Sequence, residues 1–205
     1  MAILKGTSAV SESLVEPAEG AQASRPWRSS LLLGAVFLVI YALSCSDAVQ
    51  GGDSGEFATI AALGGVPHPP GYPIFVILAQ LSNIFVPIGS AAYKAALASA
   101  LVGAICLVFV HRSVVLLTSS TLAATTAAAG LGFSVRFWQY ASVAEVFTLA
   151  ALSGAIISWV ATEVSLGRRG QAISLSLGGA MALSLAGHHS GAMLLPMVAY
   201  IIWWA

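Results

Sequence analysis

Long apolar runs separated by short polar joints dominate the chain after residue 30. A helix that crosses a bilayer needs about 20 mostly apolar residues, and several of these runs approach that length. We therefore predict an all-α integral membrane protein, a polytopic bundle of about six transmembrane helices. The predicted spans are residues 31–46, 91–117, 121–135, 141–164, 171–187 and 191–205. The last run ends without a polar tail, so we expect the chain to be truncated at its C-terminus.

The first 30 residues are polar and end in a basic, aromatic collar at residues 25–28. This composition predicts a disordered cytoplasmic tail that leads into a membrane anchor. A cleaved signal peptide is the alternative, because Ala42-Leu43-Ser44 has the small-x-small pattern of a cleavage site. The polar lead is long for a signal peptide, which favours a retained anchor.

Two shorter apolar pieces, Phe57–Val66 and Ile74–Ile88, flank a proline cluster. If neither crosses the membrane, Arg112 and the Arg168-Arg169 pair fall in the cytoplasm, as the positive-inside bias prefers. We therefore predict two interfacial helices in a first outer loop, residues 47–90. The expected location is a bacterial inner membrane, or the endoplasmic reticulum membrane of a eukaryote, with the N-terminus cytoplasmic.

Composition agrees with this class. Hydrophobic residues make up 58% of the chain and charged residues only 8%, whereas a soluble domain carries roughly 25% charged residues. The mean hydropathy is +0.90. The formal net charge is zero and no basic stripe is present, so membrane lipid is an expected partner and nucleic acid is not.

The predicted topology gathers the rare polar side chains on or near the outer face. Charged groups inside hydrocarbon cost roughly 2.5–3.5 kcal/mol each, so such residues usually face a wet cavity. We therefore expect one outward-facing polar site. Its candidate residues are Asp53, Glu56, His68, Tyr72, Arg136, Trp138, Glu145, His188 and His189.

The segment Asp53-Ser54-Gly55-Glu56 has two interpretations. An acceptor followed three residues later by Glu is a capping box that satisfies the first amides of a helix. Residues three apart also share a helix face, so the two carboxylates could instead act together. One would then deprotonate a hydroxyl while the other holds a metal or a sugar hydroxyl. His68 lies in a rigid proline turn that fixes its direction but does not need an imidazole.

The remaining candidates also have structural alternatives. Glu145 could be a first-turn acid favoured by the dipole of the following helix. The aromatic residues around Arg136 are typical of an interfacial belt, although an arginine on the outer side suggests a contact to an anionic phosphate. His188 and His189 are adjacent and do not share a helix face, so this pair alone does not predict a metal site.

Five segments resemble a known family when they are taken in order. These are DSGEF (Asp53–Phe57), HPPGYP (His68–Pro73), PIGS (Pro87–Ser90), FWQYASVAEVFTL (Phe137–Leu149) and GHH (Gly187–His189). They resemble the domain of unknown function 2723 family, which includes transmembrane-protein-260-like protein O-mannosyltransferases. That family is similar to the GT-C superfamily of polytopic glycosyltransferases.

The resemblance implies a mechanism. A sugar, such as mannose, would pass from a polyprenyl-phosphate-type lipid donor to a hydroxyl acceptor, such as a protein Ser or Thr, outside the cytoplasm. Asp53 would be the general base, and Glu56 and His68 would orient the acceptor or bind a divalent ion. Arg136, Glu145, His188 and His189 would line the donor phosphate or sugar. No cofactor is certain, and a divalent cation on Asp53, Glu56 and His68 stays open.

Two other classes remain as alternatives. An ion-coupled transporter would use Asp53, Glu56 and Glu145 as proton or cation sites, but transporters usually place such groups near the midplane and show internal repeats. No repeat is evident, and the acids fall at helix ends. A non-catalytic membrane subunit would suit the short chain.

Overall fold

The computed structural model describes residues 27–168, 170–187 and 189–204, without the side chains of residues 187, 189–191 and 204. This part of the chain is all helical. Its elements are α3 (Arg28–Ser44), α4 (Ser54–Leu63), α5 (Pro73–Phe85), α6 (Ala91–Thr118), α7 (Thr121–Gly132), α8 (Val135–Ala141), α9 (Phe147–Ser165), α10 (Gln171–Gly187), the 3₁₀ helix η1 (His189–Leu194) and α11 (Leu195–Trp204).

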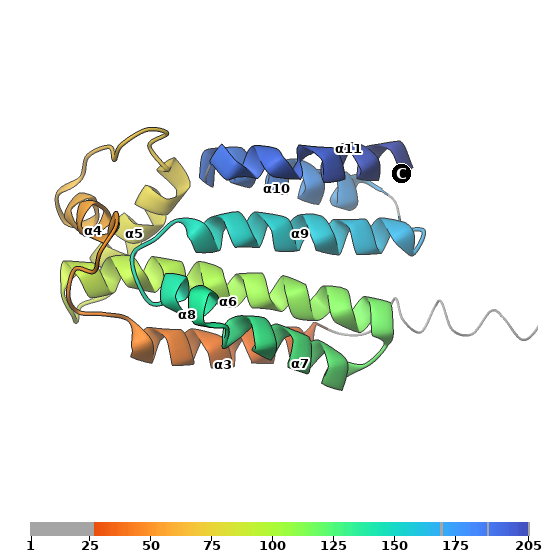
Figure 1. Ribbon diagram of the computed structural model, residues 1–205, viewed down its shortest axis with the longest axis horizontal. Helices are drawn as coiled ribbons and strands as arrows, with labels where there is room; N and C mark the ends of the chain where they lie inside the picture. The colour runs from red at the N-terminus through yellow and green to blue at the C-terminus, as the bar shows by residue number, and fades with distance from the viewer. Residues whose placement is uncertain (1–26, 169, 188, 205) are drawn as a thin grey trace, which may run out of the picture.

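The long helix α6 forms the centre of the bundle, and α3, α4, α5, α7, α8 and α9 all contact it. Ser90 starts α6, because its hydroxyl accepts the backbone N–H of Tyr93 at 3.1 Å. Ser119 ends it in a left-handed conformation at φ 58°. Helices α10 and α11 lie on the far side of α9 (Figure 1), where they build a second apolar cluster around Ile157 and Val160.

Two described helices, α6 and α9, are long and apolar enough to cross a membrane, with mean hydropathies of 2.3 and 1.5 in their best windows. The outer surface supports a membrane setting. Helix α3 exposes 68% of Leu32 and 84% of Leu43, and soluble proteins rarely expose large contiguous apolar patches. The count of about six spans stays a prediction, because the other apolar helices are shorter.

The helix bounds differ from the predicted ones where long-range hydrogen bonds hold the backbone in an irregular conformation. The third predicted span, 121–135, breaks after α7, and residues 142–146 form an irregular linker before α9. Three long-range hydrogen bonds hold this linker. The Ser142 carbonyl accepts the Ser46 amide at 3.2 Å, and the Ser99 hydroxyl bonds to both the N–H and the C=O of Glu145. Residues 1–26 of the predicted tail lie outside the described residues, and α3 begins at Arg28 rather than residue 31.

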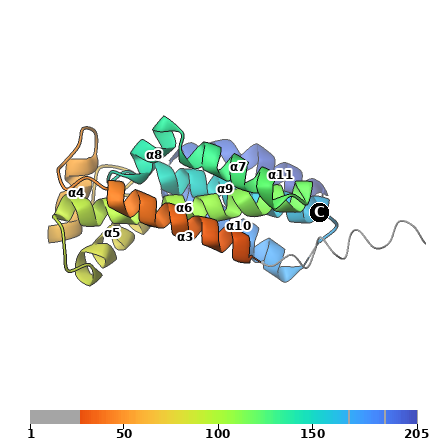
Figure 2. The ribbon, with the colours of Figure 1, turned by 90° about the horizontal axis from the view of Figure 1, so that it is seen from below.

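The two helices predicted in the first outer loop are present as α4 and α5, and they gather at one end of the bundle (Figure 2). Helix α4 ends at residue 63 because Gly64 and Gly65 adopt φ values of 78° and 129°. Helix α5 ends at residue 85, before Pro87, since a proline disfavours helical geometry in the preceding residue. Their position at the membrane interface stays a prediction.

Gly132, the last residue of α7, allows three helices to pack closely. The Tyr41 hydroxyl of α3 donates to its carbonyl oxygen at 2.8 Å. A Cβ at this position would overlap the Phe37 ring and lie 2.8 Å from the Leu107 side chain. Only a glycine therefore fits between α3 and α6.

We expect Gly132→Ala to destabilise the protein by about 1–3 kcal/mol, the usual cost of overpacking a core. The measurement is the thermal unfolding midpoint in detergent. Gly130→Ala on the same helix is the matched control, because a Cβ there meets no atom within 4 Å. That change should be neutral or stabilising by about 0.5–1 kcal/mol. Equal midpoints for the two variants would contradict the close packing at Gly132.

Candidate functional site

The turn before α4 positions the first candidate residues. The Ser54 hydroxyl accepts the Gln50 amide at 2.9 Å and donates to the Gln50 carbonyl at 2.7 Å, which closes the turn that carries Asp53. Asp53 is the N-cap residue of α4, but its side chain makes no capping hydrogen bond. Its carboxylate is 48% exposed and is directed to His68.

Glu56 binds His68 twice. One carboxylate oxygen accepts the His68 backbone N–H at 2.8 Å, and the other lies 2.6 Å from Nδ1 of the ring. The hydrogen bond to His68 lowers the pKa of Glu56, and the same bond raises the pKa of His68. The capping-box interpretation is therefore wrong, because Asp53 forms no cap and Glu56 is used to hold His68.

The second ring nitrogen of His68 faces two other groups. Nε2 lies 3.2 Å from the Tyr72 hydroxyl and 3.7 Å from Oδ2 of Asp53. Tyr72 precedes α5 in a left-handed conformation at φ 40°, and its ring packs against Phe57 and His68. Burial raises the pKa of Tyr72, so its hydroxyl stays a donor. The neutral tautomer of His68 that fits both contacts carries its proton on Nδ1, which donates to Glu56, and accepts the Tyr72 hydroxyl at Nε2.

Glu145 reaches the same place from the linker before α9. It is only 7% exposed, and its backbone N–H and C=O both bond to the Ser99 hydroxyl of α6, at 3.0 and 2.9 Å. Its carboxylate accepts the Asp53 backbone N–H. Burial, and then the charge of Asp53, raise the pKa of Glu145. Helix α9 has no acid in its first turn, so the first-turn interpretation of Glu145 is wrong.

Gly52 makes this approach of Glu145 to the turn sterically feasible. It adopts φ 76°, and a Cβ on it would lie 2.9 Å from Oε1 of Glu145. A side chain here would therefore be strained by the backbone and would also collide with the carboxylate.

We expect Gly52→Ala to lower the free energy of unfolding by about 1–3 kcal/mol, because a non-glycine residue in the left-handed region is strained. The thermal unfolding midpoint should fall accordingly. Gly51→Ala is the control, since a Cβ on Gly51 meets nothing within 4 Å. The two variants are compared by thermal unfolding in the same detergent. A midpoint unchanged by Gly52→Ala would show that the turn can relax.

Together Asp53, Glu56, His68, Tyr72 and Glu145 form what we call the acid–histidine cluster. Ligand atoms of the first three lie within 4.8 Å of one another. Within the described residues, His68 is the only basic side chain paired with these carboxylates. The cluster therefore combines an exposed carboxylate that can accept a proton with excess negative charge that can attract a cation.

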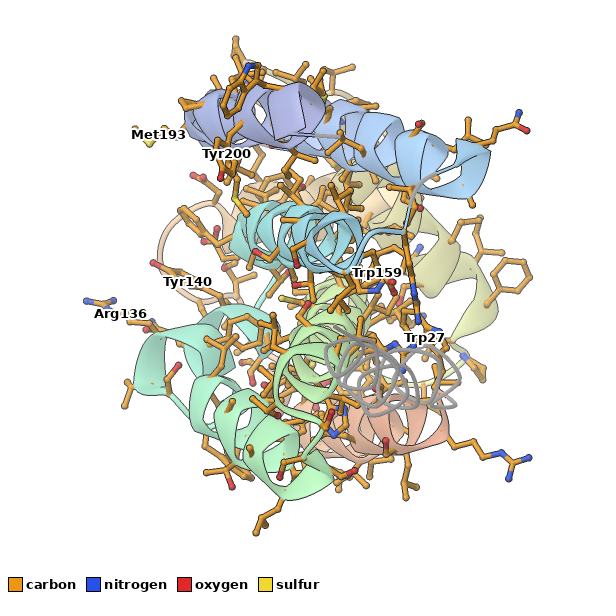
Figure 3. All side chains as sticks on the ribbon, turned by 90° about the vertical axis from the view of Figure 1, so that its right-hand side faces the viewer. Trp27, Arg136, Tyr140, Trp159, Met193 and Tyr200 are labelled. Atoms are coloured by element: carbon orange, nitrogen blue, oxygen red, sulfur yellow. The ribbon has the colours of Figure 1, made fainter. Side chains whose placement is uncertain are left out.

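Other candidates lie elsewhere. Trp138 packs against Tyr41 and Phe133. Arg136 points away from the bundle (Figure 3) and, with Tyr140, borders a groove of about 310 Å³. A second groove of about 350 Å³ continues from it between α6 and α9, and the two share Leu131, Phe137 and Ala151. His188 and the side chain of His189 lie outside the described residues.

Two residues of the site were not predicted from the sequence. Ser99 is fully buried in α6, and its only signal is a hydroxyl within an otherwise apolar run. Gly52 belongs to a Gly-Gly pair beside Asp53, and glycine permits another group to approach the backbone closely. The structure shows that the group approaching this glycine is a side chain of the protein itself.

Comparison with known proteins gives the chain's relatives. A family model described as the protein O-mannosyl-transferase TMEM260 N-terminal domain matches residues 53–205. Protein O-mannosyl-transferase TMEM260 of Mus musculus is 40% identical over 138 residues, covering 65% of this chain and 19% of that protein. The Dictyostelium discoideum protein of the same name is 33% identical over 113 residues, covering 54% of this chain and 14% of its own length. The chain thus spans less than a fifth of these relatives, and no solved structure matches it.

Proposed function

Because the chain belongs to the TMEM260 N-terminal-domain family of protein O-mannosyl-transferases, we propose that it carries the acceptor site of a membrane mannosyltransferase of the GT-C type. The donor in this proposal is a polyprenyl-phosphate-linked mannose, and the acceptor is a protein Ser or Thr hydroxyl.

The observation that carries the proposal is the acid–histidine cluster, and within it the carboxylate of Asp53. This group is exposed and is not used as a helix cap, so an acceptor hydroxyl can reach it. In the proposed step, the acceptor oxygen attacks the sugar C1 and the C1–O bond to the phosphate breaks. The phosphate leaves with the electron pair, and Asp53 takes the hydroxyl proton. A positioned base of this kind contributes typically 10²–10⁴-fold to the rate.

The distribution of basic residues supports a site on the non-cytoplasmic face. Arg28 starts α3, Arg112 lies in the last two turns of α6, and Arg168 follows α9. The start of α3 and the C-terminal ends of α6 and α9 all point away from α4 and α5 (Figure 1). Basic residues favour the cytoplasmic side, so the acid–histidine cluster belongs on the other side.

The grooves beside α8 support a lipid donor. Their walls are mainly apolar, which suits a hydrocarbon chain, and Arg136 stands at the border of one of them. A guanidinium there can bind a phosphate through two parallel hydrogen bonds. In our proposal the lipid chain lies along these grooves and its phosphate contacts Arg136.

The test is mannose transfer by the purified protein in lipid vesicles. We expect labelled mannose to move from polyprenyl-phosphate mannose to a Ser/Thr-containing peptide, and not from GDP-mannose. Protease added outside right-side-out vesicles after transfer would show on which side of the membrane the labelled peptide was formed, because only a peptide outside the vesicles is digested. Transfer from the nucleotide sugar alone would overturn the lipid donor, and transfer from neither would overturn the proposed function.

A further inference from the structure

We propose that Asp53 and His68 bind a divalent cation, with Glu145 as a third ligand and Glu56 holding the His68 ring. The role of this cation rests on the proposed function, since it would offset the charge of the donor phosphate as the C1–O bond breaks. Its binding can be tested without any transfer.

The spacing of the two primary ligands fits a metal ion. Nε2 of His68 and Oδ2 of Asp53 are 3.7 Å apart. Two ligands about 2.1 Å from one cation, at angles of about 90–120°, are about 3.0–3.6 Å apart. A shift of a few tenths of an ångström would therefore bring both atoms into coordination distance. Asp53 keeps its other oxygen for the acceptor hydroxyl.

Glu56 is placed to hold the His68 ring in position for a metal ion rather than to bind the ion itself. Histidines that bind metals usually donate their other ring N–H to a carboxylate, which fixes the ring and the tautomer. Here Nδ1 lies 2.6 Å from Glu56, and the second Glu56 oxygen is occupied by the His68 amide at 2.8 Å. Both oxygens of Glu56 are thus used by His68, and Nε2 is left as the nitrogen that faces Asp53.

A buried oxygen of Glu145 is the independent observation that points to a ligand. Oε2 of Glu145 is buried and, among the described residues, has no hydrogen-bond partner. Its carboxylate lies directly against Gly52 and Asp53. An unpartnered buried carboxylate oxygen is costly, and a cation at Asp53 would relieve that cost.

The charges and the donor set indicate the class of cation. Three carboxylates stand against one imidazole, and oxygen ligands with one imidazole suit divalent ions such as Mn²⁺. Tyr72 must give way, because its hydroxyl and a cation would compete for the single lone pair of Nε2.

The experiment is Mn²⁺ binding to the purified protein, followed by the loss of the free-ion electron paramagnetic resonance signal. We expect saturable binding that weakens at least tenfold in Asp53→Asn and His68→Asn. The asparagine at 68 can still donate to Glu56 but has no Nε2. Glu56→Gln should weaken binding by about 10–100-fold, and Tyr72→Phe should bind as tightly as wild type or tighter. Asp47→Asn, an exposed acid in the same loop, is the control and should bind like wild type.

A second measurement guards against misfolded variants. Mn²⁺ should raise the thermal unfolding midpoint of the wild type and of Asp47→Asn, but not that of Asp53→Asn. Equal Mn²⁺ affinity in wild type, Asp53→Asn and His68→Asn would overturn the inference, as would no saturable binding up to millimolar Mn²⁺. Mannose transfer by a protein that binds no Mn²⁺ would overturn the cation site and leave the proposed function intact.

Discussion

Asp53→Asn should reduce mannose transfer by about 10²–10⁴-fold while the protein still inserts into the membrane and folds. The change keeps the shape of the side chain, but a neutral amide cannot take the acceptor proton. Because the Asp53 carboxylate makes no capping bond, its replacement removes no interaction that holds the start of α4. The measurement is the initial rate of transfer to a Ser/Thr peptide, at saturating donor.

Asp47→Asn is the matched control for this experiment. Asp47 lies in the same loop and is exposed, and Oδ1 accepts the Ser90 amide at 3.3 Å, a role that an asparagine oxygen can keep. Its transfer rate should stay close to that of the wild type. Comparable rates for wild type and Asp53→Asn would exclude Asp53 as the base.

Ser99→Ala should destabilise the protein by about 2–6 kcal/mol and also slow transfer. The alanine leaves the Glu145 N–H and C=O without their partner in a buried position, and each such group costs about 1–3 kcal/mol. The linker that carries Glu145 would then be free to move away from Asp53. Thermal unfolding and the transfer rate are measured on the same preparation.

Ser153→Ala provides the comparison. Ser153 is also fully buried in a helix, but its hydroxyl donates to the Leu149 carbonyl of its own helix at 3.0 Å. That carbonyl belongs to the helix interior, so the loss should be small. If the two variants are equally stable, the Ser99 bonds to the linker do not hold the site together.

The sequence predicted the class of fold and much of the cluster for physical reasons. Long apolar runs specify helices in lipid, and the proline turn and the glycines at 64–65 delimit α4 and α5. The sequence could not predict the role of Glu56. A glutamate three residues after Asp53 is what a capping box requires, and the same glutamate can instead bind the ring and the amide of His68. That choice depends on His68, twelve residues further along the chain.

The position of the break between α7 and α9 was also beyond local patterns. The predicted spans 121–135 and 141–164 leave a joint at residues 136–140, whereas the structure forms α8 there and places the irregular linker at 142–146. The irregular linker 142–146 is held by Ser46 and Ser99, which come from distant parts of the chain. Tertiary hydrogen bonds thus override the helical preference of this stretch.

The contact between Glu145 and the Asp53 turn has a consequence for biogenesis. The two segments are separated in the chain by α4 to α8, and the linker reaches the turn only when it is docked on Ser99 of α6. A nascent chain that has placed α3 and α6 but not α9 therefore lacks a complete site. The contact between the turn and Glu145 therefore forms only after the linker 142–146 has been placed against α6, late in the insertion of this segment.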